Sequence, residues 1–430
     1  MKETCEQLVS LDVCRTASGK FCQHMLPGET VSVSPVSDPV KPSELTTLSK
    51  DRVRPICPVY ERCGGCDGLH MTYEAQTAFK DAFVNKTFEG LVSEDRIRPI
   101  IPSPLPLHYR HKAVLSATMV GKKVRLGLYR KQSRVVVPYT GCHLHDNAAN
   151  AIMKTAEDLL NAFKIPAYDP VRKSGIIKHV MVRTSKATGE ALVILVIQGD
   201  LLPNGKAIAS KLHQAHPMIK GVLTNIHRKN THLVLLEEER VLYGRPWIKE
   251  KIGDLVFTLS ARSFFQVTPV QMEKLYKVAV DAAGLKGDET VIDCYSGIGT
   301  LSLIAAKRAR DVIGIEVNKD AHLDAVRNMK DNGIGNVRFI NGDVNEAIRT
   351  MKDQVDVLMM DPTREGADAS FLDAVLALGP RKIVYVSCDP VTQARDVKVL
   401  GKRYDVLSLQ AVDMFSQTNH VESITLLSLK

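Results

Sequence analysis

Two residues near the carboxyl end of the chain could act together as a nucleophile and a base. Cys388 follows the apolar run at residues 384–387, and a cysteine thiolate can act as a nucleophile. Glu422 opens the last apolar run, with His420 two residues before it, and its carboxylate is a candidate general base. Taken alone, a cysteine is often a small buried apolar residue and a strand-end glutamate is often solvated, so both alternatives stay open. We predict that Cys388 and Glu422 are the catalytic residues.

A glycine-containing turn at residues 293–300, DCYSGIGT, lies between an apolar run and a helical pattern. Gly297 and Gly299 let the backbone pass close to a ligand. Glu316 closes the next apolar run about twenty residues on, where an acid can hold both hydroxyls of a ribose. The third glycine of the dinucleotide fingerprint is missing, so the pattern suits S-adenosylmethionine as well as NAD. A tight turn without a ligand remains the alternative.

An acidic residue ends another apolar run, in the motif MMDPTR at residues 359–364. The proline stops the strand and leaves Asp361 at the edge of the sheet where ligands bind. Asp361 or Arg364 could orient a substrate ring or polarise its carbonyl group. The alternative use of Asp361 is as the N-cap of a helix.

The nine cysteines lie at positions 5, 14, 22, 57, 63, 66, 142, 294 and 388. An odd number in a large chain without a secretion signal predicts no disulfide framework. Cys57, Cys63 and Cys66 surround a Gly-Gly turn and could wrap a soft metal centre, with Cys142 as a fourth thiolate. Zinc sites prefer paired short spacings, so the spacing here fits an iron–sulfur cluster better. Unligated, reduced cysteines are the alternative.

The chain is basic, with 57 Lys and Arg against 48 Asp and Glu and a formal net charge of +9. Such a balance favours a polyanionic partner. Residues 96–145 contain no Asp or Glu, and a one-signed stretch of this length indicates a track for phosphates. Its basic residues are Arg96, Arg98, Arg110, Lys112, Lys122, Lys123, Arg125, Arg130, Lys131 and Arg134.

Composition and length are those of a globular protein with two or three domains, at 430 residues with 44% hydrophobic and 24% charged residues. No stretch approaches the roughly 20 apolar residues of a membrane span. The first residues lack the pattern of a signal peptide, so we expect a cytoplasmic protein without a membrane partner. Nothing in the sequence indicates more than a monomer.

Three regions with different patterns should position these residues. Residues 1–50 predict a small β unit, with strands at 8–13 and 30–33, a turn at 27–29 and a Ser- and Pro-rich linker at 32–47. Residues 51–255 predict an α+β domain, and residues 256–430 predict a doubly wound α/β domain with a parallel sheet. The expected helices are 73–88, 147–163 and 205–214. The expected strands are 123–129, 179–184, 191–198, 221–226, 290–295, 312–317, 337–340, 355–360, 383–387, 404–410 and 422–427.

Taken together, the motifs resemble the RNA (uracil-C5)-methyltransferase family, which forms 5-methyluridine. C-x5-CGGC, YRHKA, GLYR, SFFQV, D-x-Y-x-GIGT, DPTR, SCDP and HVE occur in the order of that family, over residues 51–430. The resemblance implies a Rossmann-like methyltransferase domain, Cys388 as nucleophile and Glu422 as proton acceptor. It also implies a [4Fe–4S] cluster held by Cys57, Cys63, Cys66 and Cys142. The predicted S-adenosylmethionine contacts are Gln266, Tyr295, Gly297, Gly299, Thr300, Glu316, Asp343 and Asp361.

The same resemblance suggests an RNA substrate, for which we favour 23S ribosomal RNA, with the T-loop uridine of transfer RNA as the alternative. The N-terminal unit resembles the family's small RNA-binding TRAM barrel, mainly through its LPGE turn. Two rival functions compete with this interpretation. An RNA cytosine-C5 methyltransferase would typically carry a Pro-Cys pair where DPTR stands here, and a non-catalytic iron–sulfur RNA-binding protein would not need Gly297, Glu316, Cys388 and Glu422 intact.

Overall fold

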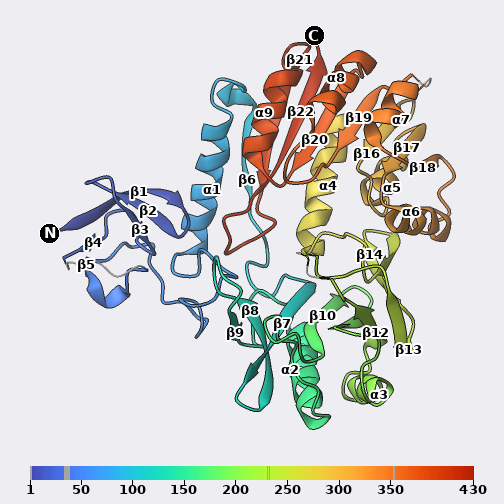
Figure 1. Ribbon diagram of the computed structural model, residues 1–430. Helices are drawn as coiled ribbons and strands as arrows, with labels where there is room; N and C mark the ends of the chain where they lie inside the picture. The colour runs from blue at the N-terminus through green and yellow to red at the C-terminus, as the bar shows by residue number, and fades with distance from the viewer. Residues whose placement is uncertain (1, 33–38, 230, 232, 352–353) are drawn as a thin grey trace.

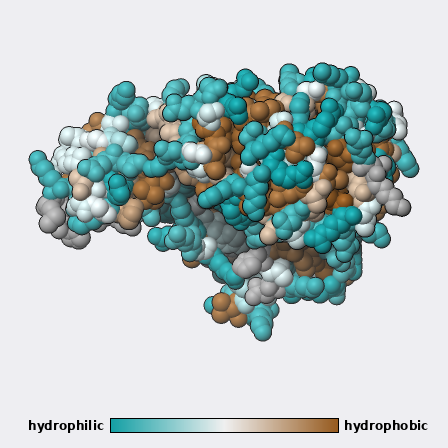
Figure 2. Space-filling view, turned by 90° about the horizontal axis from the view of Figure 1, so that it is seen from above, coloured by the Kyte–Doolittle hydropathy of each residue, from teal (hydrophilic) through white to brown (hydrophobic). Residues whose placement is uncertain are grey.

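The computed structural model describes residues 2–32, 39–229, 231, 233–351 and 354–430 (Figure 1). The N-terminal sheet projects from one side of the molecule, the central sheet lies below, and the C-terminal sheet with its helices lies above. From above, hydrophobic and hydrophilic residues are interspersed over the visible face (Figure 2). No helix of the described residues has the length and apolar character needed to cross a membrane.

The N-terminal sheet has the strand order β3-β2-β1-β4-β5. Its strands are β1 (Glu3–Ser10), β2 (Val13–Thr16), β3 (Phe21–Gln23), β4 (Thr30–Val31) and β5 (Leu45–Thr47), with the 3-10 helix η1 (Pro42–Glu44) before β5. The β unit is confirmed, but the strand predicted at 8–13 is wrong, because the turn between β1 and β2 interrupts it. The predicted linker is also wrong over its described part, since Val40 packs in the core and β5 pairs with β4. Residues 33–38 of that linker lie outside the described residues.

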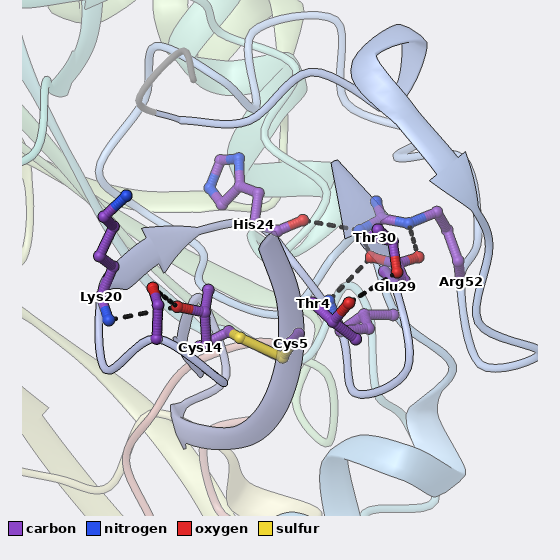
Figure 3. Close-up of a disulfide and its surroundings, with 11 residues drawn as sticks. Thr4, Cys5, Cys14, Lys20, His24, Glu29, Thr30 and Arg52 are labelled. Atoms are coloured by element: carbon purple, nitrogen blue, oxygen red, sulfur yellow. Dashed lines mark hydrogen bonds and ion pairs between the residues drawn. A yellow bond between two sulfur atoms is a disulfide. The ribbon is translucent and has the colours of Figure 1, made fainter. Parts of the chain in front are cut away.

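A disulfide joins Cys5 to Cys14 in this sheet, with 5.9 Å between their Cα atoms (Figure 3). β1 and β2 are antiparallel neighbours, so their inward-facing cysteines meet in a small core that also contains Cys22 and Met25. This single bridge departs from the expectation of no disulfide framework. The sequence spacing does not reveal it, because the pairing depends on the register of the two strands.

The central sheet has seven strands in the order β13-β12-β11-β10-β7-β8-β9. These are β7 (Lys112–Val120), β8 (Lys123–Tyr129), β9 (Val136–Pro138), β10 (Ile177–Ser185), β11 (Glu190–Ile197), β12 (Ile219–Ile226) and β13 (Glu239–Gly244). Helices α2 (Asn147–Ala162) and α3 (Gly205–Ala215) bury their apolar faces on the sheet, as their periodicity requires. The predicted mixture of helices and strands is confirmed here. A hairpin of β14 (Trp247–Ile252) and β15 (Leu255–Ser260) follows.

The C-terminal sheet has eight strands in the order β18-β17-β16-β19-β20-β22-β21-β6. Its strands are β6 (Ile97–Ile101), β16 (Thr290–Cys294), β17 (Asp311–Glu316), β18 (Val337–Asn341), β19 (Val357–Met360), β20 (Lys382–Ser387), β21 (Tyr404–Val412) and β22 (Glu422–Leu429). The helices of this domain are α4 (Pro269–Ala283), α5 (Thr300–Ala306), α6 (Lys319–Asp331), α7 (Val344–Thr350), α8 (Ala369–Leu378) and α9 (Pro390–Leu400). Two apolar cores, one on each face of the sheet, confirm the doubly wound arrangement.

Two strands depart from the predicted parallel sheet. β22 runs antiparallel to both β20 and β21, because a loop rather than a helical crossover joins β21 to β22. β6, which precedes the central sheet in the chain, pairs in parallel with β21. The helix before it, α1 (Tyr73–Thr87), begins where predicted and adds Val84 to the core of the C-terminal domain. Parts of residues 51–255, namely α1 and β6, therefore pack with the sheet of residues 256–430. The division into contiguous domains 51–255 and 256–430 stays a prediction.

Candidate active site

The predicted nucleophile and base lie opposite each other on neighbouring strands. β20 and β22 are antiparallel, and their pairing places Ser387 opposite Ser423. One step further along both strands, Cys388 comes opposite Glu422. Asp361 follows β19, whose residue Met360 pairs with Tyr385 of β20, so it lies at the same edge of the sheet. Strand register thus brings together three residues from distant parts of the sequence.

The Glu422 carboxyl group is buried and incompletely bonded. Its side chain is only 1% exposed, and Oε2 finds no hydrogen-bond partner among the described residues. Burial raises the pKa of Glu422 well above its ordinary value, and the nearby Asp361 carboxylate raises it further. The pKa of Asp361 is raised by burial and by the charge of Asp293. A glutamate in such surroundings is a stronger base than a solvated one. Its burial also excludes the alternative that Glu422 is only a solvated carboxylate at the end of a strand.

The Cys388 thiol is half-buried at the same position. Burial raises its pKa to about 12, and the carboxylates of Glu422 and Asp361 act in the same direction. The Arg364 guanidinium opposes them, and its Nε also lies 3.4 Å from a carboxylate oxygen of Asp389. Without ligands the thiol is therefore protonated near neutral pH. A proton acceptor or a cation must assist its ionisation when substrates are bound.

The glycine-containing turn has the conformation that its residue types predicted. Gly297 and Gly299 lie at φ 54° and 82°, and Tyr295 between the strand and the turn also has a positive φ, 65°. A Cβ atom on Gly299 would come within 2.6 Å of the Phe339 ring, whereas one on Gly297 would meet no atom within 4 Å. Gly299 is therefore required by packing and Gly297 by its backbone conformation beside open space.

Glu316 lies at the end of β17, where it holds this turn. One carboxylate oxygen accepts a hydrogen bond from Gly297 N–H at 2.9 Å, and the other accepts from Asn318 N–H at 2.7 Å. The structure thus places the predicted ribose-binding acid next to the glycine turn. Each oxygen retains a lone pair for a further donor.

Of the other predicted cofactor residues, Thr300, Gln266 and Asp361 are buried or partly buried at the site, whereas Asp343 is exposed. Thr300 opens α5, and Gln266 is buried next to Tyr276, whose phenol also senses the charges of Asp361 and Glu422. Asp343 follows β18 at the correct edge, but its exposed carboxylate caps α7 by accepting from Asn345 N–H at 2.8 Å. Asp361, in contrast, caps no helix, since the next helix, α8, is capped by Asp368.

Two buried residues that the prediction left out lie in the same site. Asp293 accepts a hydrogen bond from Ser302 Oγ at 2.5 Å, and burial raises its pKa to about 7. Burial also raises the pKa of Tyr276 well above its ordinary value, and the charges of Asp361, Asp293 and Glu422 add to this. The Tyr276 phenol therefore lies among the three carboxyl groups. Asp293 lies inside the glycine motif and could have been found, but Tyr276 has only a helical pattern around it.

The four clustered cysteines line one hollow beside the central sheet. Cys57, Cys63, Cys66 and Cys142 share it with apolar and aromatic neighbours, namely Val59, Tyr60, Leu69, Leu128, Val137 and Tyr139. Burial raises the pKa of Cys63 to about 11, with Cys142 and Cys57 adding to the rise. In the described part of the chain, no three His, Cys, Asp or Glu side chains are arranged to hold one metal ion. The structure thus places the four predicted ligands around one hollow.

The acid-free stretch 96–145 does not form one continuous surface. Arg96 precedes β6 of the C-terminal sheet and donates to the Val406 carbonyl at 2.6 Å. Lys112 lies in β7, where burial lowers its pKa to about 7, with help from Arg183 and Arg110. The exposed cations lie mainly at the turns around β8, at Lys122, Lys123, Arg130, Lys131 and Arg134. The phosphate track therefore stays a prediction, and its exposed cations divide between β6 of the C-terminal sheet and the turns around β8.

Known proteins of one family are similar to this chain. A model of the tRNA (uracil-5-)-methyltransferase family matches residues 72–430. An uncharacterized RNA methyltransferase of Halalkalibacterium halodurans is 36% identical over 423 residues, which cover 95% of this chain and 92% of the relative. Another from Oceanobacillus iheyensis is 38% identical over 394 residues, covering 90% and 85%.

A solved structure has the same fold over its whole length. It is the Pyrococcus abyssi tRNA (uracil-54, C5)-methyltransferase in complex with S-adenosyl-L-homocysteine, with a TM-score of 0.81 and 23% sequence identity over 99% of both chains. The family expected from the motifs is therefore confirmed. The chain belongs to the tRNA (uracil-5-)-methyltransferase family and is an S-adenosylmethionine-dependent RNA methyltransferase.

Proposed function

We propose that the protein methylates C5 of a uridine in RNA, with Cys388 as nucleophile and Glu422 as base. The observation that carries this proposal is that Cys388, directly after β20, faces Glu422 at the start of β22, together with the buried Oε2 of Glu422, which has no partner among the described residues. A buried carboxylate oxygen without a partner is costly unless a ligand uses it. Family membership supports the same reaction.

Two steps of the proposed reaction are assigned to residues of this chain, the addition at C6 to Cys388 and the removal of the C5 proton to Glu422. C5 of uracil is a weak nucleophile, so the Cys388 thiolate first adds to C6 and pushes electron density toward C5. Bound S-adenosylmethionine would supply the methyl group to C5, with its sulfur–methyl bond breaking and S-adenosylhomocysteine leaving. The Glu422 carboxylate then takes the C5 proton, and the electron pair of that C–H bond re-forms the C5–C6 double bond. The C6–S bond breaks and the Cys388 thiolate is released.

The residues around the glycine turn fit S-adenosylmethionine. We infer that Gly297 and Gly299 approach the cofactor and that Glu316 holds its ribose hydroxyls, with Gln266, Tyr295, Thr300, Asp343 and Asp361 as further contacts. Ser296 Oγ, inside this turn, is buried without a partner among the described residues and is available to the same ligand. The target base must leave its stack to reach Cys388, since a stacked base cannot enter the pocket.

For the four cysteines we propose a [4Fe–4S] cluster. Four thiols line one apolar hollow, and the spacing of Cys57, Cys63 and Cys66 suits an iron–sulfur cluster better than one zinc ion. The cluster would tie residues 57–66 to Cys142 and so join two distant parts of the chain.

Anaerobically purified protein should therefore be brown and contain about four irons per chain. The Cys66→Ser variant should lose the visible absorption and most of the iron, because it removes one thiolate ligand. Cys388→Ser is the matched control, since this half-buried cysteine lies outside the hollow and its loss should leave the iron content unchanged. One equivalent of zinc with no visible absorption would contradict the assignment.

As the substrate we propose 23S ribosomal RNA. Of the exposed cations around β8, Arg130 and Lys131 lie beside Cys63 and Cys66 and next to the N-terminal sheet, where Lys131 pairs with Asp12. A surface that combines these parts suits a folded RNA segment larger than one stem-loop. The second candidate is transfer RNA, which the family description and the name of the Pyrococcus abyssi enzyme favour.

Methylation of the two RNAs in vitro at one fixed salt concentration separates these candidates. We expect 5-methyluridine in protein-free 23S RNA at a rate at least roughly tenfold above that in unmodified transfer RNA, since a preference of about 1.4 kcal/mol gives that factor. Nucleoside mass spectrometry after digestion measures the product. Efficient methylation of the T-loop uridine with none in 23S RNA would overturn the substrate assignment and leave the C5 chemistry standing.

A further inference from the structure

The loop that leads into Glu422 is held by buried polar residues of α1. It joins β21 to β22 over residues 413–421 and extends below the sheet toward the lower part of α1 (Figure 1). The Asp413 carboxylate accepts hydrogen bonds from Lys80 Nζ at 2.6 Å and from Tyr73 OH at 2.7 Å. Lys80 is 1% exposed and Asp413 is fully buried, so α1 anchors the start of the loop through an ion pair shielded from water.

The cysteine-bearing segment holds the end of the same loop. The backbone N–H groups of Asp67 and Gly68 both donate to the Gln417 carbonyl, at 2.8 and 3.1 Å. One carboxylate oxygen of Asp67 accepts from Asn419 N–H at 2.9 Å. Asp67 directly follows Cys66, and Asn419 lies three residues before Glu422. A short path of direct contacts thus joins the hollow of the cysteines to the proposed base.

The loop needs these contacts, because its backbone is strained. Gln417 lies at φ 69°, a left-handed backbone conformation that residues other than glycine rarely adopt. Such a residue persists only where its surroundings determine it. Gln76 of α1 supplies part of that support: it donates to Gln417 Oε1 at 2.9 Å and accepts from Gln417 N–H at 3.1 Å. Asp67 adds the carboxylate contact to Asn419 N–H, so its loss should loosen the end of the loop next to Glu422.

The nucleophile does not depend on this loop. Cys388 lies between β20 and α9, and its neighbour Asp389 caps α9 by accepting from Val391 N–H at 3.0 Å. Loosening the contacts of Asp67 should therefore displace Glu422 and leave the thiol in place. The two halves of the reaction, addition at C6 and removal of the C5 proton, become separable by experiment.

We propose that Asp67 is a positioning residue for the removal of the C5 proton. Because Asp67 directly follows Cys66, this step should depend on whether the four cysteines hold their cluster. The inference rests on the proposed roles of Glu422 and of the four cysteines. Asp67 touches no reacting atom. It acts by holding the loop that sets where the Glu422 carboxylate lies.

The test compares Asp67→Ala with Asp67→Asn, using substrate RNA that carries deuterium at C5 of its uridines. In Asp67→Ala, kcat should fall roughly tenfold to a hundredfold, as a displaced catalytic group predicts, with little change in the KM for RNA. The deuterium isotope effect on kcat should rise above that of the wild type, and a methylated protein–RNA adduct that survives denaturation should accumulate. Asp67→Asn should recover activity to within about threefold, because its amide oxygen still accepts from Asn419 N–H.

Hydrogen exchange gives a readout that needs no turnover. Amides of residues 413–421 should exchange faster in Asp67→Ala and in Cys66→Ser than in the wild type, while amides of β20 stay protected. Asp67→Ser takes the place of Asp67→Ala if that variant does not fold, with the same measurements.

The outcomes separate this proposal from the proposed function. If Asp67→Ala lowers adduct formation and turnover equally, with an unchanged isotope effect, Asp67 has only a structural role and the positioning proposal is overturned. The proposed function would still stand, because wild-type protein would still form 5-methyluridine. Loss of the adduct in Glu422→Gln would instead overturn the proposed function itself.

Discussion

Replacement of Cys388 by alanine is expected to abolish methylation, with a loss of roughly 10⁴-fold or more, as for other removed nucleophiles. The thiol forms the bond to C6, and no other described group beside Glu422 and Asp361 can replace it. S-adenosylmethionine should still bind, since the glycine turn and Glu316 belong to different strands. Cys388→Ser should be almost as inactive, because an alkoxide forms with much more difficulty near neutral pH. Release of tritium from C5-labelled RNA and cofactor titration measure the two effects.

Cys294→Ala provides the matched control for this experiment. Cys294 ends β16 close to the site, but its side chain packs in one of the two apolar cores of the C-terminal domain. This variant should keep most of the activity and lose only a little stability, since the cavity left by one sulfur atom is small. Near-normal turnover of Cys388→Ala would contradict the covalent mechanism.

Replacement of Glu422 by glutamine is expected to stop the reaction after methyl transfer. The amide keeps the size of the side chain but cannot accept the C5 proton, so turnover should fall by roughly 10² to 10⁴. Methylated adduct between protein and RNA should accumulate and appear as a slow band on a denaturing gel. His420→Gln is the matched control, because His420 lies close in sequence and is exposed. Free turnover of Glu422→Gln together with inactivity of His420→Gln would move the role of base to the histidine.

The local elements of this protein could be predicted because their patterns are regular. β8 has the predicted bounds 123–129, and α1 differs from its predicted range only at its last residue. The carboxyl ends of parallel strands also meet at one edge by construction. For that reason, the order of strands and motifs along the chain is enough to predict that Asp361, Cys388 and the glycine turn share one site.

Long-range pairing was beyond the reach of such patterns. Nothing local in residues 97–101 indicates that β6 pairs with β21, more than three hundred residues later. The antiparallel direction of β22 depends on a loop, and the loop depends on Lys80 of α1. A lysine in a helix is normally solvated, so the sequence gives no sign that Lys80 is buried. For the same reason, the sequence does not reveal that Lys80 pairs with Asp413.

The central claim is that Cys388 forms a covalent bond to C6 of the target uracil before Glu422 removes the C5 proton. The most direct measurement uses RNA containing 5-fluorouridine, because the fluorine at C5 cannot be removed as a proton. Incubation with S-adenosylmethionine followed by digestion and mass spectrometry should give a stable adduct on the peptide that contains Cys388. Its mass should include the nucleotide and one transferred methyl group. Absence of any adduct with RNA that the enzyme otherwise methylates, or an adduct on another residue, would contradict this account.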